Sequence, residues 1–118
     1  MSNKRKQGEL ESQILGCLWD RPEGLTSQQI LAMLGDDDLA ITTVLTVLSR
    51  LSDKGLVYRE QASGRTFLFR ASQSREQRTA AILLASMENS QNPDAVFSHF
   101  VAQLPRAQVD SLKKALGY

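Results

Sequence analysis

The stretch from Leu39 to Gly55, LAITTVLTVLSRLSDKG, constrains the fold most strongly, because its residues follow the repeat of an α-helix with one buried face. The apolar stripe, widened by Val47, comprises Ile41, Val44, Leu45, Leu48 and Leu51. The opposite face carries short hydroxyl side chains and then cations: Thr42, Thr43, Thr46, Ser49, Arg50 and Lys54. Hydroxyl and guanidinium groups suit contact with phosphates and base edges. Taken alone, the stretch fits a threonine-rich surface helix equally well.

Two helices are expected before this stretch. Apolar residues recur at helical spacing from residue 8, and the sequence RPEG at 21–24 ends that first helix near Trp19. Thr26 followed by Gln29 is the pattern of a capping box at the start of a second, short helix, which Gly35 ends.

Three consecutive acids, Asp36, Asp37 and Asp38, lead into the long helix. We interpret them as a turn in which Asp38 or a neighbour caps the helix, and in which their negative charge stabilises the positive end of the helix dipole. Beside a DNA-reading helix such acids would repel phosphate, so they have to point away from DNA or they count against DNA binding.

A β-hairpin is expected directly after Gly55, which fits the left-handed position at a helix end. Segments 56–61 and 66–70 alternate with period two around the turn Ala62-Ser63-Gly64-Arg65. Three helices followed by a hairpin is the order of a winged helix-turn-helix, in which the third helix enters the major groove. Arg65, near the tip of the wing, is then a candidate for phosphate or minor-groove contact; the alternative is an exposed turn arginine.

Residues 72–118 are expected to form three short amphipathic helices. Ser74 with Gln77 predicts a capped start, and segment 89–93 and Pro105 interrupt the helical pattern. Helices of this size bury little surface alone, so we predict that they interlock with a second copy in a two-fold dimer. The apolar residues predicted to form that interface are Leu83, Leu84, Met87, Phe97, Phe100, Val101, Leu104, Leu112 and Leu116.

The predicted fold class is therefore mainly α with a small antiparallel β-hairpin. It comprises a flexible basic arm at 1–7, a winged-helix DNA-binding domain at 8–71 and a helical dimerisation segment at 72–118.

Composition narrows the function. Net charge is only +1, but residues 49–78 hold seven Lys and Arg against three Asp and Glu, so positive charge is concentrated around the predicted recognition helix and wing. The chain has a single cysteine, Cys17, and a single histidine, His99, so we expect no disulfide, metal site or cofactor. The sequence also lacks the pattern of a nucleophile beside a base, so we do not expect an enzyme. No run approaches the roughly 20 apolar residues of a membrane span, so we expect a cytoplasmic protein without membrane insertion.

Several short motifs follow one another along the chain in a recognisable order: Gly8-Glu9-Leu10-Glu11, Leu18-Trp19, the stretch from Thr42 to Leu51, Lys54-Gly55, and Gly64-Arg65 with the aromatic strand that follows. By these motifs the chain resembles, from residue 8 onward, the penicillinase-repressor (BlaI/MecI/CopY) family of bacterial transcription regulators. This resemblance implies a homodimeric repressor that binds a palindromic DNA operator. By position, Thr43, Thr46 and Arg50 match the operator-contacting face; Thr42 stands where some members have lysine, and Lys54 is expected to meet phosphate.

The resemblance also implies two inducing mechanisms. The copper-responsive branch uses paired C-terminal cysteines, and the sequence after Ala71 has none. In the beta-lactam branch, which concerns antibiotic resistance, a membrane sensor protease triggers cleavage at an Asn-Phe bond in the dimerisation segment. The matching pair here is His99-Phe100, so cleavage at this bond is a hypothesis whose alternative is that His99 is a partly exposed helix residue.

Two functions from different classes follow. The first is a dimeric sequence-specific repressor. The second is a winged-helix module that binds protein without reading DNA, favoured by the near-zero net charge and the acids at 36–38. Steep loss of DNA affinity with salt would distinguish the first from the second.

Overall fold

A computed structural model describes residues 8–118, so the predicted basic arm at 1–7 lies outside the described residues. The chain divides into two compact units, one ending at Arg78 and the other running from Thr79 to Tyr118.

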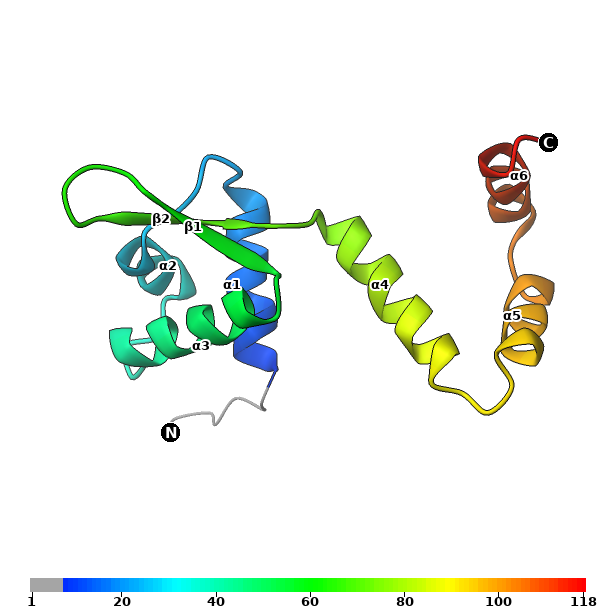
Figure 1. Cartoon of the computed structure of the whole chain (residues 1–118), viewed down its shortest axis with the longest axis horizontal. Coiled ribbons are helices and arrows are strands. Elements are labelled where there is room, and N and C mark those ends of the chain that lie inside the picture. Colours follow the sequence, from blue (N-terminus) through cyan, green and yellow to red (C-terminus); the bar gives the residue numbers. More distant parts are fainter. Residues whose placement is uncertain (1–7) are drawn as a thin grey trace. The chain divides into compact units, whose positions relative to one another are not determined.

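The N-terminal unit consists of three helices and a two-stranded sheet (Figure 1). The helices are α1 (Glu9–Asp20), α2 (Ser27–Leu34) and α3 (Ile41–Asp53), and the strands are β1 (Val57–Gln61) and β2 (Phe67–Ala71). This is the expected winged helix-turn-helix order, and the predicted fold class is confirmed.

One apolar core holds these elements together. The large side chains that are almost fully buried come from all three helices: Ile14, Leu18, Ile30, Val44, Leu48 and Leu51. Complete burial of such a side chain stabilises a fold by about 1.5–3 kcal/mol relative to exposure. The hairpin closes the same core with Val57 and Phe69. The core therefore fixes which face of α3 turns inward.

The sequence signals at helix ends are largely confirmed. Thr26 and Gln29 form both hydrogen bonds of the capping box, with the Gln29 carboxamide accepting from the Thr26 amide at 2.8 Å. Gly35 and Gly55 adopt left-handed conformations, with φ of 64° and 75°.

The predicted cap of the recognition helix is wrong. The residue at the N-cap of α3 is Ala40, whose methyl side chain cannot accept a hydrogen bond from the helix amides. The Asp36 carboxylate instead accepts from the Asp38 amide at 3.0 Å, and the Asp36 carbonyl accepts from the Leu39 amide at 3.1 Å. The Asp36 side chain thus stabilises the turn before α3, since an aspartate side chain readily closes a turn two residues on.

The hairpin is antiparallel, with Val57 opposite Ala71 and Gln61 opposite Phe67. Gly64 takes a left-handed φ of 62° in the connecting turn, a conformation that glycine adopts without steric cost. A further bridge joins Leu25 to Phe69 through two backbone hydrogen bonds of 3.1 and 2.8 Å. The connection between α1 and α2 therefore anchors the wing.

The remaining helices are α4 (Arg75–Glu88), α5 (Pro93–Ala102) and α6 (Arg106–Ala115), separated at the two predicted breaks. Ser74 and Gln77 form the expected capping box, with hydrogen bonds of 2.8 and 3.0 Å. Asn92, one residue before Pro93, caps α5 by accepting from the Ala95 amide. None of the residues of these three helices is buried. Their apolar side chains thus lack a closed core within one copy.

Candidate nucleic-acid interface

The outward face of α3 carries four of the predicted contact residues: Thr42, Thr43, Thr46 and Arg50 are exposed. The helix is fixed from the other side by the buried Val44, Val47, Leu48 and Leu51. The prediction for Leu45 is wrong, since 43% of this residue is exposed. It falls beyond the edge of the buried stripe because the core is centred between Val47 and Leu48.

Hydrogen bonding differs among the polar residues of this face. The Thr46 hydroxyl donates to the Thr42 carbonyl at 2.9 Å, which leaves its oxygen lone pairs to accept from a ligand. The Arg50 guanidinium forms no ion pair with any residue between 8 and 118. An unpaired, exposed guanidinium keeps its donors available for a guanine edge or a phosphate.

Lys54 differs from this set because it is already paired. Its ammonium donates to both carboxylate oxygens of Glu11, at 3.1 and 3.0 Å. This ion pair connects the end of α3 to the first turn of α1. Contact with phosphate would therefore compete with an intramolecular partner.

The wing contributes two arginines. Arg65 is exposed in the hairpin turn, as expected. Arg59 lies over the Phe67 ring, 4.3 Å from its centroid, and sequence reasoning had not selected it. The signal available was the alternation along β1, which places Arg59 on the same face as the aromatic residues of β2.

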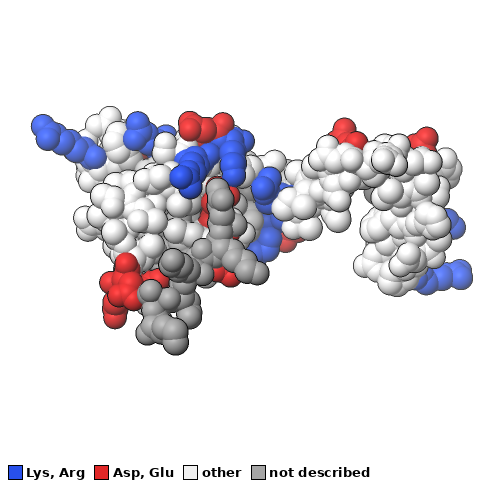
Figure 2. Space-filling model, turned by 90° about the horizontal axis from the view of Figure 1, so that it is seen from below, with Lys and Arg blue, Asp and Glu red and all other residues white. Residues whose placement is uncertain are grey.

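Charge is unevenly distributed over this unit. Figure 2 shows several Lys and Arg side chains, with an acidic group among them, along one edge of the N-terminal unit. A separate acidic cluster lies at the opposite edge in the same view. Cations gathered at one edge favour the approach of a polyanion there.

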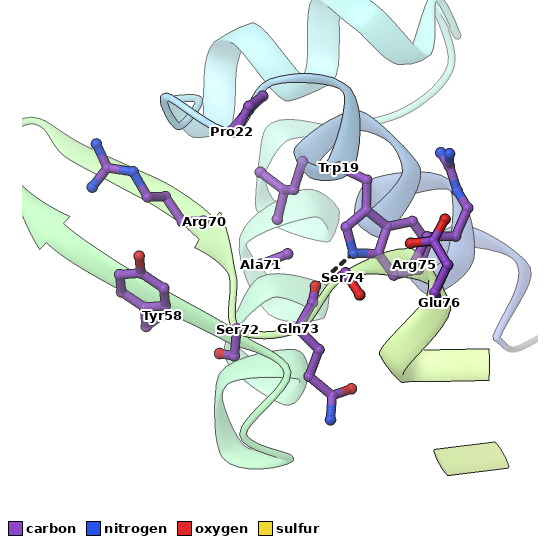
Figure 3. Close-up of a pocket in the computed structure, with 11 residues that line it drawn as sticks. Trp19, Pro22, Tyr58, Arg70, Ala71, Ser72, Gln73, Ser74, Arg75 and Glu76 are labelled. Atoms are coloured by element: carbon purple, nitrogen blue, oxygen red, sulfur yellow. Dashed lines mark hydrogen bonds between the residues drawn. The ribbon is translucent and has the colours of Figure 1, made fainter. Parts of the chain in front are cut away.

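A hollow of about 420 Å³ lies between the end of α1, the hairpin and segment 72–76 (Figure 3). The Trp19 indole donates to the Gln73 carbonyl at 2.9 Å, and the Arg75 guanidinium lies 5.2 Å from the Trp19 ring centroid. Arg70 pairs with Glu60 and donates to the Glu23 carbonyl at 2.8 Å. Both arginines that line the hollow, Arg70 and Arg75, thus have partners, and the contacts of Trp19 anchor the segment that leads into α4.

The predicted dimerisation residues have incompletely covered side chains. Leu83, Leu84, Phe97, Phe100 and Leu116 are exposed, and Met87, Val101, Leu104 and Leu112 are half-buried. Six apolar residues of α4 and α5 line an open groove of about 300 Å³: Leu83, Leu84, Met87, Val96, Phe97 and Phe100. His99, of the predicted cleavage pair, is exposed near the end of α5.

Cys17 is a buried thiol of the core and does not belong to this interface. Burial raises the pKa of the Cys17 thiol, and the nearby Asp20 carboxylate raises it further, so the thiol is protonated at neutral pH. Among residues 8–118, no cluster of His, Cys, Asp and Glu is arranged to hold a metal ion. Within the same residues, no helix has the length and apolar character needed to cross a membrane.

The three-helix core, the hairpin and the exposed polar face of α3 define a winged helix-turn-helix protein. The family model described as Penicillinase repressor matches residues 7–117. The chain belongs to the penicillinase repressor family. It is 33% identical over 120 residues to the Transcriptional regulator BlaI of Mycobacterium tuberculosis, covering 98% of this chain and 86% of that protein. The chain is thus a transcriptional regulator and not an enzyme.

Solved structures share the fold at low sequence identity. A MarR-family transcriptional regulator from Rhodococcus is 20% identical with a TM-score of 0.51, covering 90% of this chain and 69% of that one. MepR of Staphylococcus aureus, solved as a complex with DNA, is 23% identical with a TM-score of 0.51, covering 91% and 72%.

Proposed function

We propose that the protein is a homodimeric, sequence-specific repressor that binds a palindromic DNA operator in the cytoplasm. The observation that carries this proposal is the exposed face of α3, where Thr42, Thr43, Thr46 and Arg50 are uncovered on a helix that the core holds rigidly. Thr43, Thr46 and Arg50 read base edges in the major groove, and Thr42 lies beside them.

Contacts with the DNA backbone come from the flanks of this helix. Arg65 and Arg59 of the wing meet phosphates or the minor groove, and Lys54 reaches a phosphate when it leaves Glu11. Membership of the penicillinase repressor family supports DNA binding as such, and MepR, which shares the fold, has been solved as a complex with DNA.

Dimerisation through residues 72–118 supplies a second copy of α3, which reads the second half-site of the operator. The open apolar groove between α4 and α5 supports this part of the proposal, since paired copies would cover side chains that one copy leaves exposed. Two reading helices then engage two half-sites at once, which raises affinity without new contacts.

The test is binding to duplex DNA over a salt series. We first select a duplex from a randomised pool and then measure its dissociation constant between about 50 and 300 mM salt. A repressor that neutralises several phosphates loses affinity steeply, with log K falling by about 0.9 per phosphate contact for each unit of log salt. Salt-independent binding would instead support a winged-helix module that binds protein.

For induction, we propose cleavage between His99 and Phe100 under a beta-lactam-type signal relayed by a membrane sensor protease. The exposed His99 near the end of α5 supports this, whereas Phe100 lines the groove that the second copy covers, so cleavage requires local opening of this helix. Incubation with cells that carry an activated sensor should yield a truncated product. Loss of repression with an intact chain would contradict cleavage as the inducing event.

A further inference from the structure

Leu45 is an exposed leucine on the face of α3 that the proposed function assigns to DNA. The buried apolar side chains of α3 point to the core. Leu45, by contrast, is 43% exposed and lies between Thr42 and Ser49 on the outer surface of the helix. One exposed leucine is ordinary on a protein surface. Its surroundings, however, make this one informative.

Leu45 lines an open groove of about 560 Å³ between α3, the start of α2 and the hairpin. The apolar part of the lining is Leu45 with Phe67 and Phe69, and the cationic part is Arg59 and Arg65. No Asp or Glu among the described residues lines this groove. It therefore combines an apolar surface with positive charge and has no acid to repel a phosphate.

These features match one group on DNA. In the major groove the edges of adenine, guanine and cytosine offer hydrogen-bond donors and acceptors, whereas thymine alone also presents an apolar 5-methyl group. A leucine cannot donate or accept a hydrogen bond, so burial of that methyl group is the only base-specific contact open to it.

We propose that Leu45 reads a thymine 5-methyl group in each operator half-site. The inference rests on the proposed DNA binding and adds a specificity-determining residue to it. Leu45 excludes water from the methyl group, while Thr42 and Thr46 on its flank contact neighbouring edges. The operator then requires an A·T pair, in one orientation, opposite this residue.

The test replaces thymine by deoxyuracil, which removes only the methyl group. Each thymine of the selected duplex is replaced in turn, and the dissociation constants of wild type, Leu45→Ala and Met33→Ala are compared. Met33→Ala is the matched control, because Met33 is an apolar residue with 41% exposure on α2 and does not line the groove.

We expect one substituted position per half-site to weaken wild-type binding about fourfold, the effect of losing one buried methyl group. Met33→Ala keeps this sensitivity to loss of the methyl group. Leu45→Ala loses it and binds the thymine duplex and the deoxyuracil duplex with equal affinity. If wild type and Leu45→Ala respond equally at every position, Leu45 does not read a methyl group. If no duplex is enriched from the pool, sequence-specific DNA binding fails and the inference fails with it.

Discussion

Arg50 is the residue whose removal tests the reading face most directly. Its guanidinium is exposed and has no ion pair within residues 8–118, so Arg50→Ala leaves no buried group unsatisfied. We expect the variant to keep its stability, to lose about 1–3 kcal/mol of binding free energy for the selected duplex, and to relax base preference at one position. Titration of matched and single-mismatch duplexes measures both effects.

Arg21→Ala is the control for this change, because Arg21 is an exposed arginine that follows α1 and whose guanidinium donates to the neighbouring Asp20 carbonyl at 3.2 Å. It removes the same charge elsewhere in the unit. Equal losses in the two variants would mean that Arg50 contributes only general charge.

Lys54 poses a competition between Glu11 and phosphate. Exposed ion pairs contribute about 0–1 kcal/mol, so Glu11→Gln should change the free energy of unfolding little. The freed ammonium should strengthen DNA binding and steepen the dependence of log K on log salt by about one unit. Urea unfolding and a salt series check the two effects.

The double variant Glu11→Gln with Lys54→Ala separates this from the simple loss of an acidic charge. If the double variant binds as tightly as Glu11→Gln alone, Lys54 makes no phosphate contact.

Cys17 predicts a pH dependence of stability. Burial raises the pKa of its thiol above the ordinary 9.0, so the folded chain keeps a proton that the unfolded chain releases. The stability contributed by Cys17 is fully present below pH 9, and it falls as the pH rises through the folded pKa. The free energy of unfolding of wild type minus that of Cys17→Ala should therefore decrease above pH 9 in urea titrations. A constant difference would contradict burial of the thiol.

At the level of elements, Trp19 connects α1 to the segment that leads into α4. Trp19→Phe keeps an aromatic ring but removes the hydrogen bond from the indole to the Gln73 carbonyl. We expect a loss of about 1 kcal/mol in unfolding free energy and faster amide hydrogen exchange around residues 73–77. Unchanged exchange in this segment would show that the hydrogen bond does not order it.

How far the elements follow from sequence depends on whether their signals are local. The capping boxes at Thr26 and Ser74 and the glycines at 35, 55 and 64 are local, and these boundaries were predicted correctly. The cap of α3 was not, because an aspartate can close a turn or cap a helix and only the backbone path decides between the two.

The candidate site shows the same division. Helical periodicity gave the exposed threonines and Arg50, but it placed Leu45 in the core because the stripe is wider than the surface that the neighbouring elements cover. The pairing of Lys54 with Glu11, by contrast, joins residues that are 43 positions apart in the sequence. Such contacts depend on tertiary packing, which single-sequence patterns do not encode.

At the scale of the whole molecule, the proposed repressor depends on covering the apolar faces of its C-terminal unit. Phe97 lies in the groove between α4 and α5 with 47% of its surface exposed, so Phe97→Asp disturbs no buried core in one copy. In a dimer, however, it would place a charge against apolar side chains, which is strongly unfavourable. We expect the variant to sediment as a folded monomer.

The same variant should bind the palindromic duplex far more weakly than wild type, by a factor of about 10² or more, because only one half-site is engaged at a time. Its affinity for a single half-site should be unchanged, since α3 and the wing lie in the other unit. Ser98→Asp is the control: it adds the same charge to the exposed neighbouring residue, which does not line the groove. Analytical ultracentrifugation and titration of full and half operators measure both properties. If Phe97→Asp remains dimeric and binds like Ser98→Asp, the groove between α4 and α5 is not the surface through which two copies associate.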